Sequence, residues 1–274
     1  TAYLDDDVLD KISNRKAHLT GRDISIGYRA LGNTNKNFAW YGRHGLLKVT
    51  IADRVQEAAL KNGIKCDISY HSKDTISGDS WYWFLLRCKY VLGIEGGTSI
   101  LDWDGSLHKK TGEFIKQNPD ADFEKIEQNC FPGLDGTFSG FAISPRHLEA
   151  CATESCQILT KGEYNGILKP DIHYIELKKD FSNLDSVIDT VQQDDKREAV
   201  TKRAYKDVVA SGKYTYQHYT QFVVETALGD LAEDQTDQIG SFWDTVLYHW
   251  MKLADRLKFL ILLLLYKVYR LSRG

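Results

Sequence analysis

Residues 81–95 read WYWFLLRCKYVLGIE, and this stretch indicates the fold class. Residues 81–89 are rich in apolar and aromatic side chains and predict a helix. Residues 90–95 form a short apolar run of residues that favour β-structure, which predicts a buried strand. A helix followed directly by a buried strand is half of the β-α-β unit from which parallel sheets are built.

The same alternation extends to both sides of this stretch. Apolar or alternating runs predict strands at residues 23–30 (DISIGYRA), 66–70, 157–160 and 173–177. Helical spacing, with end signals such as Gly63 and Ser144-Pro145, predicts helices at residues 46–62, 122–128, 145–152, 183–191, 194–210 and 216–231. The alternation predicts an α/β fold with a doubly wound parallel sheet.

Composition excludes several classes of protein. The chain has 274 residues, of which 42% are apolar and 27% are charged, as in globular proteins. These values exclude a wholly disordered chain, a collagen-like chain and a polytopic membrane protein. The net charge of −3 argues against a nucleic-acid coat protein. Five cysteines without a C-x-x-C pair favour a reducing compartment, and no signal peptide precedes the first residue, so we expect a cytoplasmic location.

The C-terminal end differs from the rest of the chain in charge. Residues 246–274 carry six Lys or Arg and one Asp, a net charge of +5, so residues 1–245 carry −8. Apolar residues recur there with helical spacing, but the apolar run FLILLLLY is far shorter than the roughly 20 residues that span a bilayer. We expect a Rossmann-like domain at 1–231, a polar linker at 232–241 and an amphipathic helical tail at 242–274. The tail favours peripheral attachment to an anionic membrane surface, and the alternative is a helix that packs on another domain or subunit.

Candidate ligand contacts gather in the loops that follow the predicted strands. In an open parallel sheet, ligands bind beyond the carboxyl ends of the strands. Three segments are expected there: the loop after strand 23–30 with the helix that follows, the Gly-rich loop after strand 90–95, and the start of the helix at 145. Their candidate binding residues are Arg29, Lys48, Glu95, Gly96, Gly97, Thr98, Ser99, Arg146, His147 and Glu149.

These residue types suit a nucleotide diphosphate. A glycine pair lets the backbone approach an anion, and Thr98 and Ser99 add hydroxyl and N–H donors. Arginine and lysine pair with phosphate oxygens, and a carboxylate one turn into a helix can accept both hydroxyls of a ribose. The chain has no G-x-G-x-x-G and no P-loop motif, which argues against a dinucleotide-binding enzyme and an ATP hydrolase.

Other conspicuous residues have simpler interpretations. Histidines more often form hydrogen bonds in loops or cores, and His147 is the best functional candidate among them. Asp102 and Asp104 form a D-x-D pair, but a turn closed by Gly105 explains them as well, so we expect no metal cofactor. Trp81 and its aromatic neighbours could stack on a base or a sugar, although core packing is the stronger interpretation.

Longer segments resemble a known family. Residues 143–185 (ISPRHLEACATESCQILTKGEYNGILKPDIHYIELKKDFSNLD) resemble the C-terminal, donor-binding half of GT-B glycosyltransferases. The resemblance is to the "glycosyl transferases group 1" proteins of bacterial surface-polysaccharide clusters in particular. The segments GIEGGTSILDWDG (93–105) and RAYKDVVASGKYTYQHYTQFV (203–223) fit the same group, and together they cover most of residues 23–223.

The resemblance implies a hexosyltransferase-like enzyme. It would transfer a sugar from a nucleotide diphosphate sugar to a glycan or lipid-linked acceptor in surface-polysaccharide or lipopolysaccharide synthesis. Glu149 matches the glutamate that holds the ribose, and Arg29 and Lys48 match the basic residues that hold the diphosphate. Retaining members have an E-x7-E pattern that Phe141 breaks here, so no catalytic residue is assigned. The acceptor half of a GT-B enzyme is missing from this sequence, so it is expected in a partner domain or subunit, or to have been removed.

A second class of function stays open at this point. A donor-binding half without an acceptor half also fits a non-catalytic sugar-nucleotide or carbohydrate-binding module that scaffolds an assembly complex. A measured sugar transfer would separate the two classes. For the enzyme we expect a peripheral location on the cytoplasmic, inner face of the bacterial cell membrane, and no nucleic-acid partner.

Overall fold

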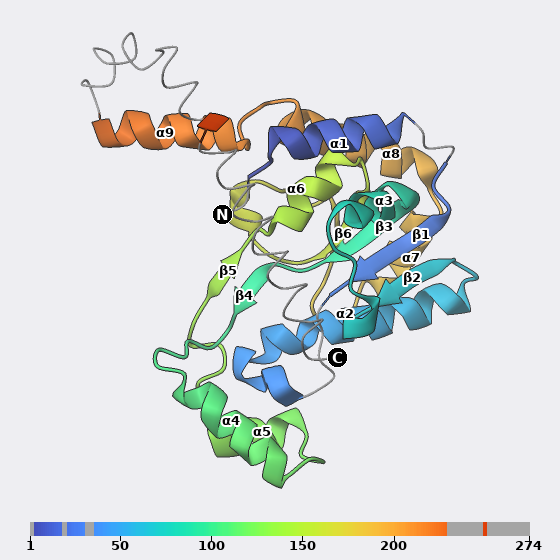
Figure 1. The fold of residues 1–274 in the computed structure, drawn as a ribbon. Helices are drawn as coiled ribbons and strands as arrows, with labels where there is room; N and C mark the ends of the chain where they lie inside the picture. Colours follow the sequence, from blue (N-terminus) through green and yellow to red (C-terminus); the bar gives the residue numbers. More distant parts are fainter. Residues whose placement is uncertain (1–2, 18–20, 31–35, 229–248, 251–274) are drawn as a thin grey trace, which may run out of the picture. The chain divides into compact units, whose positions relative to one another are not determined.

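The computed structural model describes residues 3–17, 21–30, 36–228 and 249–250 (Figure 1). The chain divides into two units, Thr1–Tyr219 and Thr220–Gly274. The tail predicted at 242–274 lies outside the described residues, apart from His249 and Trp250. Within the described part of the chain, no helix has the length and apolar character needed to cross a membrane.

A five-stranded parallel sheet forms the centre of the first unit. Its strands are β1 (Ile24–Arg29), β2 (Cys66–Ser69), β3 (Cys88–Gly93), β6 (Cys156–Thr160) and β7 (Ile175–Leu177). They lie in the order β2-β1-β3-β6-β7, and every neighbouring pair is parallel. The predicted strands are therefore confirmed, with ends that agree within two residues. The order of the strands reverses between β1 and β3.

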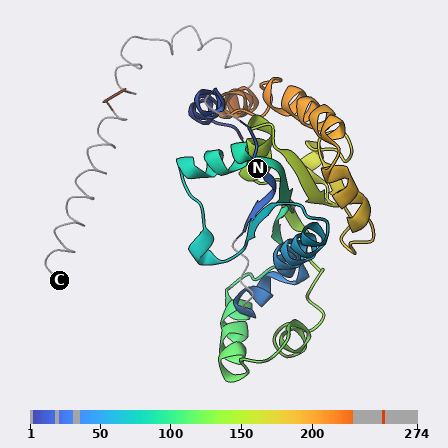
Figure 2. The same cartoon turned by 90° about the vertical axis from the view of Figure 1, so that its right-hand side faces the viewer.

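Helices pack on both faces of this sheet (Figure 1, Figure 2). The α-helices are α1 (Asp6–Lys16), α2 (Arg43–Lys61), α3 (Asp79–Arg87), α4 (Ser106–Gln117), α5 (Phe123–Cys130), α6 (Pro145–Ala152), α7 (Leu184–Val191), α8 (Asp194–Ala204) and α9 (Tyr216–Leu228). Shorter helical turns are η1 (Lys36–Tyr41), η2 (Ser72–Asp74), η3 (Tyr164–Gly166) and the π-helical η4 (Tyr205–Val209). Apolar residues of α2 and α7 pack on one sheet face, while α3 and α6 cover the other with α1 against them. The prediction of an α/β, Rossmann-like parallel sheet is confirmed.

The sequence pattern does not predict α1, α4 or a small antiparallel hairpin. The hairpin consists of β4 (Gly96–Thr98) and β5 (Gly140–Ala142). Helix α4 begins two residues after the D-x-D pair, and the Asp102 carboxylate accepts hydrogen bonds from the backbone N–H groups of Leu107 and His108 in its first turn. The pair therefore caps a helix. Among the described residues, no group of His, Cys, Asp and Glu is arranged to hold a metal ion.

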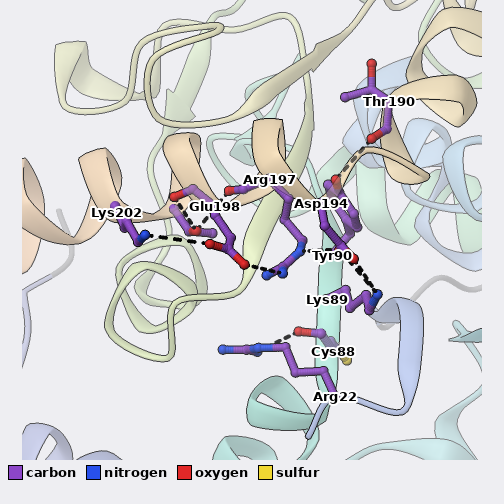
Figure 3. Close-up of polar contacts among 10 residues, drawn as sticks. Arg22, Cys88, Lys89, Tyr90, Thr190, Asp194, Arg197, Glu198 and Lys202 are labelled. Carbon is purple, nitrogen blue, oxygen red and sulfur yellow. Dashed lines mark hydrogen bonds and ion pairs between the residues drawn. The ribbon is translucent and has the colours of Figure 1, made fainter.

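Arg22 joins the ends of two helices on the α3/α6 side of the sheet. Its Nη1 donates to the carbonyl oxygens of Leu86 (3.1 Å) and Cys88 (2.6 Å), and its Nη2 donates to that of Thr153 (2.6 Å). Burial lowers the pKa of Arg22, and the positive charge of Arg197 acts in the same direction. Figure 3 shows the contact with Cys88 and the nearby Arg197. One guanidinium thus satisfies carbonyl groups that the ends of α3 and α6 leave without helical partners.

Candidate functional site

A pocket of about 300 Å³ opens at the carboxyl ends of β1 and β3, on the sheet face that α3 and α6 cover. The strand order reverses between these two strands, and ligands of open α/β sheets bind at such switch points. The volume suits a small ligand. The charged, polar and aromatic residues that line the pocket are Tyr28, Arg29, Lys48, Trp81, Phe84, Glu95, Ser144, Arg146, His147 and Gln157.

Two glycines let side chains of the flanking elements approach the sheet beneath this pocket. A Cβ at Gly27 would lie 2.3 Å from Sγ of Cys88. A Cβ at Gly93 would lie 2.7 Å from Cδ2 of Leu159 and 3.1 Å from Nε2 of His147. The distances of 2.3 and 2.7 Å are shorter than real Cβ contacts, so a larger residue at either glycine would force Cys88 or Leu159 to shift. Glycine within a strand often marks such a close approach.

Two cations border the pocket without a carboxylate partner. Lys48, on α2, is half-buried, and this burial lowers its pKa, with a smaller effect from the charge of Arg146. Arg146, on α6, donates from Nη1 to the carbonyl oxygen of Arg29 (2.6 Å) and lies 5.0 Å from the ring centroid of Trp81. Neither cation forms an ion pair with a carboxylate that the structure describes. Uncompensated positive charge beside a pocket favours an anionic ligand.

A capping box built from Ser144 and His147 holds the start of α6 at the pocket. The backbone N–H of Ser144 donates to Nδ1 of His147 (3.0 Å), so this nitrogen carries no proton. Burial lowers the pKa of His147 to about 4. Pro145 occupies the first helical position, where its lack of an N–H has no cost. The neutral imidazole therefore has a structural role: it caps the N-terminus of α6, the end of a helix that attracts anions.

The capping box predicts an acid-sensitive fold. The pKa of His147 falls from 6.5 to about 4 on folding, so the unfolded chain binds the proton more readily and acid favours unfolding. Its contribution to stability is complete above pH 6.5 and falls by about 2 kcal/mol at pH 5. His147→Gln keeps a capping side chain without a titrating group. Urea denaturation at pH 7 and pH 5 should show a smaller loss for the variant, and an equal loss would contradict the assignment.

Trp81 and Glu149 form a hydrogen-bonded pair at the pocket wall. Nε1 of Trp81 donates to Oε2 of Glu149 (2.7 Å). Burial raises the pKa of Glu149, while this hydrogen bond and the charge of Arg146 oppose the rise. Trp81 lines the pocket and Glu149 does not. Trp81 packs against the apolar cluster that contains Phe84, as the sequence predicts, and it also lines the pocket. The carboxylate predicted to hold a ribose holds the indole instead.

Two other predicted contacts line the pocket but are engaged elsewhere. Nη2 of Arg29 donates to Oδ1 of Asp67 on β2 (2.6 Å), and its remaining bonds go to backbone carbonyl oxygens. Oε1 of Glu95 accepts from the backbone N–H groups of Glu163 (3.2 Å) and Tyr164 (2.8 Å). Both side chains therefore hold neighbouring segments in place. Their contact with a ligand stays a prediction.

The glycine pair and its hydroxyl neighbours separate at the hairpin. Gly96 lines the pocket, whereas Gly97, Thr98 and Ser99 do not. The strand β4 pairs with β5 in an antiparallel two-stranded sheet that is separate from the five-stranded sheet. Oγ1 of Thr98 donates to backbone carbonyl oxygens, and Oγ of Ser99 donates to the carboxylate of Asp135 (2.6 Å). Of the ten predicted binding residues, six therefore line one pocket: Arg29, Lys48, Glu95, Gly96, Arg146 and His147. The other four, Gly97, Thr98, Ser99 and Glu149, do not line it.

Sequence reasoning missed Gln157 as a pocket residue. It lies in β6, whose other residues except the terminal threonine are apolar or cysteine. A polar residue inside a buried strand needs partners, and that contrast is the signal in the sequence. Ser144 was predicted only as a helix cap, which it is.

Comparisons of the whole chain with protein-family models and with curated proteins find no match.

Proposed function

We propose that this pocket binds a nucleotide diphosphate sugar, and that the chain is the donor-binding part of a GT-B-type glycosyltransferase. The observation that carries the proposal is the position of Lys48 and Arg146, two cations without carboxylate partners, beside a pocket at the β1/β3 switch point. A parallel sheet of this kind suits a nucleotide ligand. The acceptor would be a glycan or a lipid-linked sugar.

In this proposal, each part of the ligand contacts the pocket residues that suit its chemistry. The diphosphate lies between Lys48, Arg146 and the start of α6, since arginine, lysine and helix N-termini all stabilise phosphate charge. The nucleoside lies against Trp81 and the apolar inner wall formed by residues such as Phe84 and Leu85. No metal ion is required to neutralise the diphosphate in this arrangement, because the two cations do so.

The transfer step draws on more than this pocket. No residue of the pocket is assigned as a general base, and in this proposal the acceptor and its activating residue would come from a partner domain or subunit. The basic, apolar segment at 242–274 would keep the enzyme on the inner face of the bacterial membrane, near lipid-linked acceptors.

Calorimetric titration of the full chain tests the proposal. UDP, GDP, ADP and dTDP, each with its glucose conjugate, should be compared with the matching nucleosides. At least one diphosphate should bind, and its nucleoside should bind at least about tenfold more weakly, since only the former carries the charge that the cations pair with. Binding of nucleosides as strong as that of diphosphates would overturn it. Release of sugar to an added acceptor would separate an enzyme from a scaffold.

Glu149 should act on the ligand through Trp81. Glu149→Leu removes the acceptor for the indole N–H and should weaken diphosphate binding by about tenfold. Glu149→Gln keeps an oxygen that can accept the same hydrogen bond and should restore most of the affinity. Calorimetry on both variants measures this. If Glu149→Gln binds as weakly as Glu149→Leu, the carboxylate contacts the ligand itself, as the resemblance implies for a ribose.

A further inference from the structure

Gln157 lies at the inner end of the pocket. It is 1% exposed and pairs with Val91 across the β3/β6 register, and Val91 in turn pairs with Gly27 on β1. These three residues form one row across the middle of the sheet, and all three line the pocket. Arg146 is exposed and Lys48 is half-buried, so the pocket runs from cations near its mouth to this row at its floor.

The orientation of the Gln157 carboxamide is fixed by two contacts. Its Nε2 donates to the carbonyl oxygen of His147 (3.2 Å) and to Sγ of Cys151 (3.3 Å), which uses both N–H groups. A flipped carboxamide would set its oxygen against the His147 carbonyl oxygen, so the amide can sit only one way. The side-chain oxygen Oε1 is then left without a donor from any residue that the structure describes.

Gln157 lines this pocket together with the apolar residues Phe84, Leu85 and Val91, and Val91 is its partner on β3. A hydrogen-bond acceptor in such a place lowers the free energy only of a ligand that brings a donor, and it penalises a ligand that displaces water and brings none. Sites built in this way discriminate strongly between a ligand with an N–H and an analogue without it.

We propose that Gln157 is a specificity-determining residue, whose Oε1 accepts a hydrogen bond from a ring or exocyclic N–H of the ligand's nucleobase. The inference rests on the proposed function, since it takes the phosphate groups at the mouth to place the base at the floor. It extends that function by stating which ligands are rejected: those whose inner end is a hydrocarbon or carries only acceptors.

The hydrogen bond is tested by two changes, made singly and together: methylation of the base in the ligand, and replacement of Gln157 in the protein. The ligands are UDP, dTDP, GDP and ADP and their base-methylated forms, in which a ring or exocyclic N–H is replaced: N3-methyl-UDP, N3-methyl-dTDP, N1-methyl-GDP, N2,N2-dimethyl-GDP and N6,N6-dimethyl-ADP. For the diphosphate that binds wild type most tightly, methylation should weaken binding by about tenfold or more. Gln157→Met has a similar size but no acceptor, so methylation should then change affinity by less than about threefold.

Two controls separate this result from steric and structural effects. A loss caused only by the bulk of the methyl group would persist in Gln157→Met. Cys151→Ala removes one contact of Nε2 but keeps Oε1, so the wild-type ratio should persist there. Circular dichroism tests whether Gln157→Met is folded. If the variant does not fold, the wild-type protein alone still tests the inference, because equal affinities for the parent and methylated ligands would overturn it.

The outcomes also distinguish this inference from the proposed function. If wild type binds none of the four diphosphates, the proposed function fails and the inference fails with it. If a diphosphate binds and the methylation ratio is the same in wild type and Gln157→Met, the pocket binds nucleotides but Gln157 does not read the base.

Discussion

Replacing Arg22 by methionine is expected to lower the free energy of unfolding by about 3–5 kcal/mol. The guanidinium donates to the carbonyl oxygens of Leu86, Cys88 and Thr153. Methionine fills part of the volume but donates nothing, so several acceptors at the ends of α3 and α6 lose their partner at once. Each buried acceptor without a partner costs about 1–3 kcal/mol. Urea denaturation followed by circular dichroism measures the change.

Arg87→Met is the matched control for this prediction. Arg87 is the last residue of α3, directly before β3, and its guanidinium pairs with the exposed carboxylate of Asp23 instead of with buried carbonyl groups. Exposed ion pairs contribute about 0–1 kcal/mol, so this variant should lose less than about 1 kcal/mol. Arg22→Lys should recover only part of the stability, because one ammonium cannot reach carbonyl groups on both helices. Equal losses for Arg22→Met and Arg87→Met would show that Arg22 is not a helix-joining residue.

Removing both cations at the pocket is expected to weaken nucleoside diphosphate binding by at least about 3 kcal/mol, which is more than 100-fold. Hydrogen bonds to charged groups contribute about 1.5–3 kcal/mol each, and Lys48 and Arg146 supply one or more apiece. Methionine is the replacement of choice at both positions, because its chain can keep the packing that Arg146 makes over Trp81. Calorimetry of the double variant Lys48→Met, Arg146→Met measures the loss.

The control for the cations lies on the same helix as Lys48. Lys61 ends α2 and pairs with Glu57 one turn earlier, away from the pocket. Lys61→Met should leave diphosphate affinity within about twofold, because exposed pairs contribute little. The double variant should keep most of its affinity for the free nucleoside. Parallel losses for diphosphate and nucleoside would mean that the two cations shape the pocket and do not contact phosphate.

The sequence predicts the sheet well because its strands are short apolar runs with clear ends. Gly63 follows the last residues of α2 in a left-handed conformation, and Ser144 and Pro145 open α6, both as the pattern indicates. Helix α1 is not predicted, because Ile12 is its only fully buried residue and charged residues fill most of its surface. The β4/β5 hairpin is not predicted either, since its partner strands are three residues each and lie more than 40 residues apart in the chain.

The position of the pocket was predicted more accurately than the side chains that line it. The rule that ligands bind at the carboxyl ends of parallel strands locates the pocket from the strand pattern alone. Which side chains enter it depends on partners that are distant in the sequence. Arg29 meets Asp67, 38 residues away, and Glu149 meets Trp81, 68 residues away. No local pattern carries either pairing, so both residues were expected to face a ligand.

A crystal structure of the chain with the nucleotide diphosphate sugar that binds it in calorimetry would show whether the β1/β3 pocket holds this ligand. We expect electron density for the diphosphate between Lys48 and Arg146 at the start of α6, with the base against Trp81 and its N–H within hydrogen-bond distance of Gln157. Density for the ligand at any other place, with the β1/β3 pocket filled only by water, would contradict the account.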